Sequence, residues 1–384
     1  MALGHEIAVA KEQRFGILDD HVEWDRHVES WFATGFHSED LSMIEQLPAR
    51  LKPGVTIAVC TYKRAQSLCR LIDSIAAQTY QADCLVIVDA SPDDETENAI
   101  REQKGLREFG GQFLYLRVSG PLKGLTRQRN FALRWVSTDL VAFFDDDLVL
   151  DTACLNELKK AHSVGAESIV GVGIRLDTSD RIGWEWHWRW LFRVVPNLEP
   201  GRYHRTGFST PWRNLPADRN TVEGDWLHGG ATMWKTSAAR RVGFYTGFCG
   251  HGPPSGEDLE FSLRIGQEGK LVLATKAKAQ HLHDPSGRPN HVRRGYQLIT
   301  NLYRIHRRAF PNGDWNDFSL FAYGWSLDTL FLCRHFVFPS QIWSTFQQIV
   351  GRCLAAAQII SQHRSTIKTE KPNVGDQVDA ISKA

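Results

Sequence analysis

The chain has 384 residues, of which 42% are hydrophobic, and its formal net charge is +1. This length allows one large α/β domain with attachments or two medium domains, and the hydrophobic content is enough to build a core. The balanced charge excludes a global field that would draw the protein to nucleic acid, so we expect no nucleic-acid partner.

The sequence also indicates the cellular compartment in which the protein resides. Its seven cysteines are odd in number and form no Cys-x-x-Cys pair, which is typical of a reducing compartment without a disulfide framework or zinc site. The first residues lack the basic start and apolar stretch of a secretory signal. The most apolar segment, between Arg334 and Arg352, is interrupted by polar residues and is short for a membrane span. We therefore predict a soluble cytoplasmic protein with a possible peripheral contact at the inner face of the plasma membrane.

Along the chain, residues 1–54 are polar and aromatic with helix-like spacing, and they predict an N-terminal extension that is partly helical. An alternating pattern follows. Continuous apolar runs predict buried strands at 55–60, 84–89, 113–118 and 139–147, and amphipathic or capped segments between them predict helices.

This alternation indicates an α/β fold with a mostly parallel central sheet and helices on both faces. Ligands of such sheets bind beyond the carboxyl ends of the strands. Three of these ends carry polar residues, and we expect them to meet in one crevice: Thr61-Tyr62, Asp89-Ala90-Ser91 and Asp145-Asp146-Asp147.

The second half of the chain is less regular. It contains a tryptophan-dense run at 184–190, a Gly/Pro-rich loop at 248–256 and a predicted helix at 257–268. We divide the main domain, 55–310, into a donor half (55–150) and an acceptor half (151–310). Residues 311–362 predict a helical region, and residues 363–384 a polar, disordered tail.

Three acids close the fourth predicted strand. Asp145, Asp146 and Asp147 repel one another, whereas a hard divalent cation takes carboxylate oxygens as ligands. Residues i and i+2 of a strand point the same way, so Asp145 and Asp147 are the expected metal pair and Asp146 faces the other side. The alternative is a helix N-cap or a solvated loop.

Together these motifs resemble the inverting glycosyltransferases of family 2, which have the Rossmann-like GT-A fold. The matching residues, spread over about 55–285, are Cys60-Thr61-Tyr62-Lys63-Arg64, Val88-Asp89-Ala90-Ser91, Arg129-Asn130, the DXD-like Asp145-Asp146-Asp147, Gly229-Gly230 and Gly256-Glu257-Asp258. Each motif is weak alone, but their order and spacing make a strong joint signal. The sequence departs from the family at Cys60, where a proline is usual.

The resemblance implies a nucleotide-sugar donor pocket. Thr61 and Tyr62 would lie beside the base, Asp89 would accept a hydrogen bond from it, and Arg129 would reach the diphosphate or the base. A cap on the next helix is the alternative role of Asp89. The acids of the DXD-like motif, Asp145 and Asp146 included, would contact the donor.

The resemblance also assigns the catalytic centre. The Asp of the Glu-Asp pair, Asp258, would be the base that removes the proton of the acceptor hydroxyl, and Glu257 would contact the acceptor. An acidic N-cap of the following helix is compatible with the same residues. His281 would complete a Mn²⁺ or Mg²⁺ site with Asp145 and Asp147, and His283 is the alternative ligand.

The tryptophan run allows two interpretations. Aromatic faces stack on sugars, so Trp186 is a candidate acceptor contact. Alternating aromatic residues on a half-buried strand would give the same pattern.

We therefore expect a metal-dependent enzyme that moves a sugar from a nucleotide-diphosphate sugar, with UDP-sugars preferred, to a carbohydrate or glycolipid acceptor with inversion. The sequence has no Gln-x-x-Arg-Trp motif, which favours single addition in surface polysaccharide or glycoconjugate synthesis over processive synthesis. The alternatives are a sugar nucleotidyltransferase and a non-catalytic carbohydrate-binding protein of the same fold. A nucleotidyltransferase usually has a glycine-rich loop after strand one, and no glycine stands there.

Overall fold

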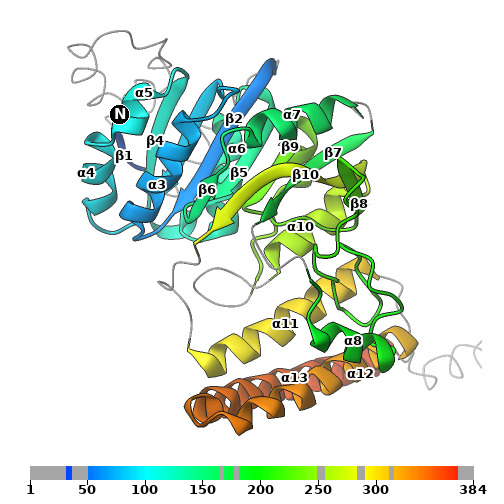
Figure 1. Cartoon of the computed structure of the whole chain (residues 1–384). Helices are drawn as coiled ribbons and strands as arrows, with labels where there is room; N and C mark the ends of the chain where they lie inside the picture. The colour runs from blue at the N-terminus through cyan, green and yellow to red at the C-terminus, as the bar shows by residue number, and fades with distance from the viewer. Residues whose placement is uncertain are drawn as a thin grey trace, which may run out of the picture. The chain divides into compact units, whose positions relative to one another are not determined.

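The computed structural model describes residues 32–36, 51–164, 168–176, 181–248, 256–282, 290–310 and 315–370. By their contacts the residues divide into two compact units, 1–288 and 289–384. The first unit contains the sheet, and the second is helical (Figure 1). This contact boundary lies ahead of the predicted boundary at 310/311, and the predicted division into donor and acceptor halves stays a prediction.

The described residues of the first unit form a ten-stranded sheet in the order β1-β4-β3-β2-β5-β9-β7-β10-β6, with β8 paired to β10. Its strands are β1 (Phe32–Phe36), β2 (Lys52–Thr61), β3 (Cys84–Asp89), β4 (Gln112–Val118), β5 (Thr138–Asp145), β6 (Leu148–Leu150), β7 (Ile169–Leu176), β8 (Thr221–Gly224), β9 (Ala231–Lys235) and β10 (Lys270–His281). The first five strands in the spatial order are parallel, and β9 lies antiparallel between β5 and β7. The predicted α/β GT-A architecture with its mostly parallel sheet is confirmed.

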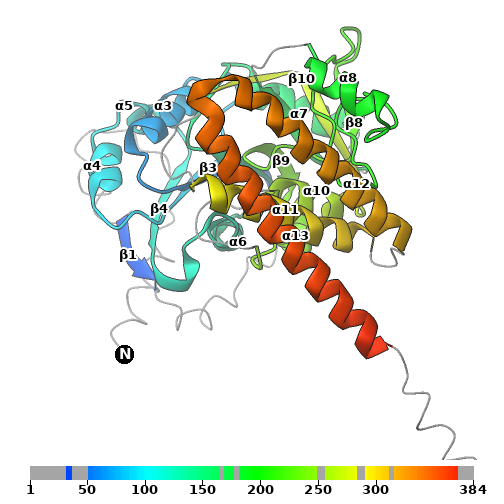
Figure 2. The same ribbon diagram turned by 90° about the horizontal axis from the view of Figure 1, so that it is seen from below.

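The helices of this unit are α3 (Ala65–Ala76), α4 (Glu95–Arg101), α5 (Lys104–Glu108), η2 (Gly120–Leu122), α6 (Leu125–Trp135), α7 (Cys154–Val164), α8 (Trp184–Leu191), α9 (Thr236–Val242) and α10 (Glu257–Ile265). Figure 2 shows α3 and α7 on one side of the sheet and α6 on the other.

Both faces of the central strands are buried, which explains why their sequences are continuously apolar. Ile57 and Leu85 face the core that α3 and α7 cover, whereas their chain neighbours Ala58 and Val86 face the opposite side and are equally buried. Side chains of a strand alternate between the faces, so a sheet covered twice needs apolar residues at every position.

The helical unit consists of α11 (His291–Ala309), α12 (Trp315–Leu332), η3 (Cys333–Val337), η4 (Pro339–Gln341) and α13 (Ile342–Glu370). The predicted helical C-terminal region is therefore confirmed. Its last helix ends at Glu370, inside the segment expected to be a disordered tail, and the rest of that tail lies outside the described residues. Of the N-terminal extension only strand β1 is described, and it pairs in parallel with β4. Within the described ranges, no helix is long and apolar enough to cross a membrane.

Candidate active site

The carboxyl ends of β2, β3 and β5 lie next to one another in the sheet. Thr61 is in register with Asp89, and Cys60 is in register with Asp145. The predicted convergence of these three strand ends is thus present in the structure. Of the two candidate base contacts at the end of β2, Thr61 is buried and Tyr62 is exposed.

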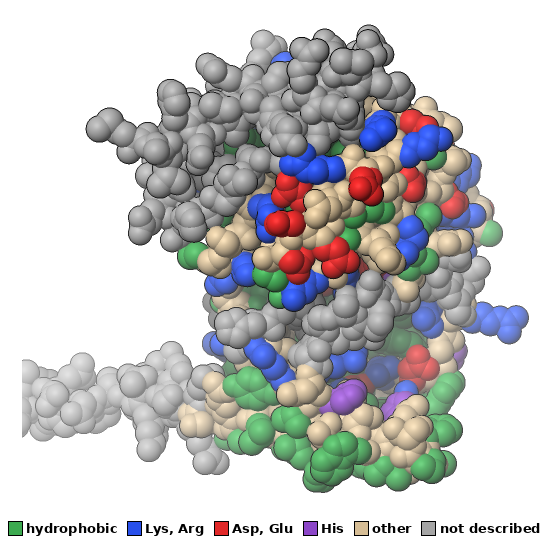
Figure 3. Space-filling model, turned by 90° about the vertical axis from the view of Figure 1, so that its left-hand side faces the viewer, with side chains coloured by type: hydrophobic (Ala, Val, Ile, Leu, Met, Phe, Trp, Pro, Cys, Tyr) green, Lys and Arg blue, Asp and Glu red, His purple; other side chains and the backbone are tan. Residues whose placement is uncertain are grey.

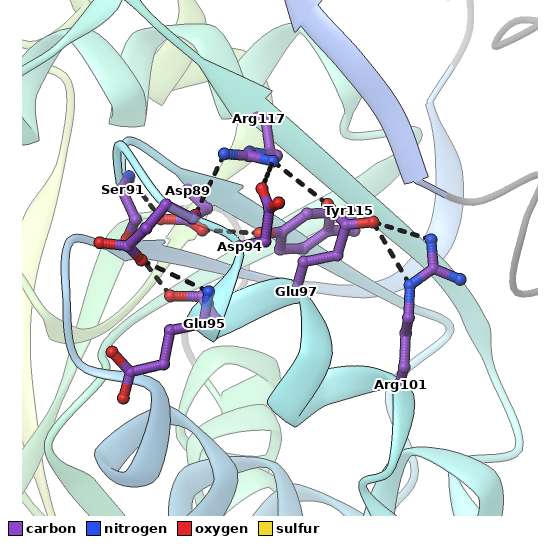
Figure 4. A network of polar contacts seen from close by, with 10 residues as sticks. Asp89, Ser91, Asp94, Glu95, Glu97, Arg101, Tyr115 and Arg117 are labelled. Atoms are coloured by element: carbon purple, nitrogen blue, oxygen red, sulfur yellow. Dashed lines mark hydrogen bonds and ion pairs between the residues drawn. The ribbon is translucent and has the colours of Figure 1, made fainter.

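Asp89 is fully buried at the end of β3, and its donors come from the protein itself. Its Oδ2 accepts a hydrogen bond from the Tyr115 hydroxyl at 2.6 Å, and its Oδ1 accepts one from the Ser91 backbone N–H at 2.8 Å (Figure 4). Burial, and then the charge of Asp89, raises the pKa of Tyr115, which keeps the hydroxyl protonated as a donor. Nearby, Arg117 pairs with Asp94 and Glu97. Asp89 therefore has a fixed orientation, with its lone pairs only partly used.

The acidic run does not continue the strand, because β5 ends at Asp145 and the next two residues form a turn. Asp146 is buried: it accepts hydrogen bonds from the Thr61 hydroxyl at 2.7 Å and from Arg64 Nη1 at 3.0 Å. Asp147 Oδ2 lies 3.5 Å from the same Arg64 nitrogen. The expectation that Asp146 faces away from Asp147 is therefore wrong, because strand alternation ends where the chain turns.

Asp147 also meets the predicted histidine ligand. Its Oδ1 lies 3.1 Å from His281 Nε2, at the end of β10. The hydrogen bond to Asp147 raises the pKa of His281. A carboxylate oxygen and an imidazole nitrogen side by side suit a divalent cation such as Mn²⁺. Among the described residues no group of three or more His, Cys, Asp or Glu side chains is arranged to hold a metal ion. The alternative ligand, His283, lies outside those residues.

Arg129 lies under Asp145 and is only 2% exposed. Its Nη2 is 3.1 Å from Asp145 Oδ1, and its Nη1 is 3.9 Å from Glu257 Oε1. The guanidinium also lies against the rings of Phe143 and Phe244, at 6.0 and 5.4 Å. Burial alone lowers the pKa of Arg129, but the surrounding carboxylates raise it overall, so the cation is permanent. In this structure Arg129 holds acidic side chains of the site in place.

Gly229 and Gly230 allow the three parts of the site to approach one another. A Cβ at Gly230 would lie 1.9 Å from the Asp145 Cγ, and a Cβ at Gly229 would lie 2.8 Å from Arg129 Nη1 and 2.9 Å from the Asp258 Cβ. No real Cβ fits at such distances. The glycine pair is therefore required by the close approach of the β5 end to the start of α10.

Helix α10 begins directly after Gly256, whose φ of +91° favours glycine. Its first two residues are Glu257 and Asp258, and the Asp258 Oδ1 accepts a hydrogen bond from the Leu259 N–H at 2.8 Å. Burial, together with the charge of Asp258, raises the pKa of Glu257 to about 8, against the opposing effect of Arg129. Glu257 therefore keeps its proton to a higher pH than an ordinary glutamate does, and in its protonated form it can donate a hydrogen bond.

Two residues of this site, Tyr115 and His228, belong to none of the sequence motifs. His228 directly precedes the glycine pair and packs edge-on against Trp226, with ring centroids 4.9 Å apart. Burial lowers the pKa of His228, against the charges of Asp258 and Asp145. In the sequence, only the position of His228 next to Gly229-Gly230 indicates that it belongs to the site. Tyr115 has the pattern of an ordinary strand residue.

The tryptophan run forms the helix α8, so its interpretation as a half-buried strand is wrong. Trp184, Trp188 and Trp190 are exposed, and Trp186 is partly buried with Arg189 over its ring at 4.7 Å. The role of Trp186 as an acceptor contact therefore stays a prediction.

A family comparison agrees with the motifs of the sequence. Residues 56–220 match the model of Glycosyl transferase family 2, which confirms the predicted resemblance over this part of the chain. No curated protein sequence matches the chain.

Similar solved structures include Staphylococcus aureus TarS, with 14% identity over 74% of this chain and a TM-score of 0.43. They also include the mannosyltransferase PcManGT from Pyrobaculum calidifontis in complex with GDP-Man and Mn²⁺, with 15% identity over 92% of this chain and 95% of that chain and a TM-score of 0.44. GalNAc-T7 with UDP, GalNAc and Mn²⁺ has 14% identity over 66% of this chain and 47% of its own, with a TM-score of 0.47. The chain spans 44% of the TarS chain.

Proposed function

We propose that this protein transfers a sugar from a nucleotide-diphosphate sugar, with UDP-sugars as the first candidates, to an acceptor hydroxyl with inversion at the sugar carbon. One observation carries the proposal. The glycine pair brings the acidic end of β5 to the first turn of α10, where Asp258 follows Glu257. The acids at the end of β5, which would face the donor, and the carboxylate of Asp258, which would face the acceptor, then lie in one site. The family match over residues 56–220 supports the same conclusion.

On the donor side, the nucleotide would lie over the ends of β2 and β3. Asp89 is oriented by Tyr115 and Ser91 and keeps acceptor capacity for an N–H of the base. Tyr62, exposed beside it, offers a ring for stacking. Asp145, Asp147 and His281 would hold Mn²⁺ or Mg²⁺, which when bound neutralises the charge of the leaving nucleotide. The contact between Asp147 and His281 supports this ligand set.

On the acceptor side, Asp258 would take the proton of the attacking hydroxyl while the new glycosidic bond forms. The anomeric carbon becomes positively charged as the leaving group departs, as it does in glycoside hydrolysis. Glu257, whose pKa is raised, would contact the acceptor and in its protonated form donate a hydrogen bond to it, and Arg129 would keep Asp145 and Glu257 in place. Attack on the side opposite the nucleotide gives inversion.

The acceptor is proposed to be a carbohydrate or glycolipid, with Trp186 as a contact, and the reaction a single addition in surface polysaccharide or glycoconjugate synthesis. The chain lacks the Gln-x-x-Arg-Trp motif of processive synthases, which supports single addition. No observation favours a nucleotidyltransferase, which would release pyrophosphate instead of a nucleoside diphosphate.

The test combines binding and turnover. UDP is titrated calorimetrically into the protein with and without Mn²⁺, and UDP-sugars are then screened for release of UDP. We expect Asp147→Ala to lose the Mn²⁺-dependent part of the affinity and Asp89→Ala to lose affinity with and without the metal. The exposed Asp218→Ala is the matched control and should bind as the wild type does. Equal affinity in all three variants would contradict the proposal, and so would release of pyrophosphate from UTP and a sugar 1-phosphate in place of UDP release from a UDP-sugar.

A further inference from the structure

The helical unit exposes large apolar side chains where α12 turns into α13. Val337 is 78% exposed and Trp343 is 68% exposed. We call this surface the apolar tip, and its members are Phe336, Val337, Phe338, Ile342, Trp343 and Phe346. In Figure 3, hydrophobic side chains gather over the helical unit at the lower edge of the view. Contiguous exposed apolar surface of this kind marks an interaction site.

The apolar tip is separate from the core of its own unit. Helices α11 and α13 pack so closely that a Cβ at Gly351 would lie 1.9 Å from the Val292 carbonyl oxygen. The core between them contains Ile299, Ala355 and Ile359. The aromatic residues at the start of α13, Trp343 and Phe346, are exposed and take no part in this core.

The charges of the unit indicate what that partner is. Among its described side chains both acids, Asp317 and Asp328, are buried, whereas Arg294, Arg307 and Arg308 are exposed. The sequence contains no Asp or Glu from residue 329 to residue 369. The described side chains of this unit therefore expose cations and no carboxylate.

We propose that the apolar tip inserts into the interface of an anionic lipid bilayer while the exposed arginines contact the headgroups. Trp and Phe prefer the membrane–water interface, and basic residues are attracted to anionic lipid at close range. The described helices do not cross a membrane, so the contact is interfacial. In a symmetric dimer, the cationic helical units of two copies would face each other. This repulsion disfavours a second copy of the chain as the partner of the apolar tip.

Vesicle co-sedimentation of the full chain, without nucleotide or metal, tests this proposal independently of the transfer reaction. The vesicles are phosphatidylcholine alone or phosphatidylcholine with phosphatidylglycerol. We expect binding to the mixed vesicles, weakened roughly tenfold or more by Val337→Ser with Trp343→Ser. The matched control is Val164→Ser with Trp190→Ser, which removes the same residue types from exposed positions in the other unit and should leave binding unchanged.

A second pair of variants tests how much the exposed arginines contribute to vesicle binding. Arg307→Gln with Arg308→Gln should weaken binding to the anionic vesicles several-fold, and Lys104→Gln with Arg107→Gln, exposed in the sheet unit, should not. Light scattering of the same proteins completes the test. No binding to either vesicle, equal binding by the tip variant and its control, or a dimer that the tip variant converts to a monomer would each overturn the proposal.

Discussion

Replacing Arg129 by Gln should destabilise the sheet unit, because it removes the cation that lies under the acidic site. At 3.1 Å and an effective dielectric constant of about 20, the attraction between Arg129 and Asp145 is about 5 kcal/mol before desolvation is subtracted. Breaking a buried ion pair by deleting one partner usually costs about 3–5 kcal/mol. The Asp145 side chain is 39% exposed, so water can partly rehydrate the freed carboxylate, and we expect the lower end, about 3 kcal/mol.

Thermal unfolding followed by circular dichroism measures this loss. For a unit of this size, about 3 kcal/mol corresponds to a fall in Tm of roughly 6–12 °C. Arg127→Gln is the matched control: Arg127 lies on the same helix, is exposed and contacts only a backbone carbonyl at 3.3 Å, so its Tm should move by about 1–2 °C at most. An Arg129→Gln variant as stable as this control would refute the role of Arg129 as a buried counter-charge.

Three further predictions follow from the site. Gly230→Ala places a Cβ 1.9 Å from the Asp145 Cγ at the end of β5, so this variant should have a much lower Tm. The control is Gly110→Ala, whose Cβ would have no atom within 4 Å and should leave Tm nearly unchanged. Equal shifts in Tm would contradict the close approach. Tyr115→Phe removes a donor of buried Asp89 and should cost about 1–3 kcal/mol in urea unfolding, and no loss would mean that this bond is unimportant. The pKa of Glu257 is raised to about 8, above its unfolded value, so the folded state binds more protons and the wild type should lose stability as pH rises from about 5 to 8. In Glu257→Gln this part of the decline should be absent, and identical stability–pH curves would show that Glu257 is not shifted.

Strands β2, β3 and β5 were predictable because the middle of each is a short apolar run buried on both faces. Local pattern therefore located β2, β3 and β5 and the polar residues at their ends. It failed at the tryptophan run, because aromatic residues at every second position suit a strand, yet no residue of α8 is buried and no sheet face constrains it.

The contacts that build the site depend on chain segments that are far apart in sequence. Asp147 meets His281 and Asp89 meets Tyr115 only after the sheet has formed, and no local period encodes such pairs. The direction of Asp147 relative to Asp146 also depends on where β5 ends, which sequence patterns give to within only a few residues. The Gly229-Gly230 pair was a more informative signal than local periodicity, because a Cβ at Gly230 would collide with Asp145.

The central claim is that this protein transfers a sugar with Asp258 as the base. Asp258→Asn keeps the shape of the side chain and removes its basicity, and the donor side of the site should be untouched. The most direct measurement compares kcat with the acceptor found by screening, and donor affinity, between Asp258→Asn and the wild type. The account predicts that kcat falls by about 10²–10⁴ while donor affinity stays within a few-fold. Near-normal kcat for Asp258→Asn would contradict it, because another group would then remove the proton.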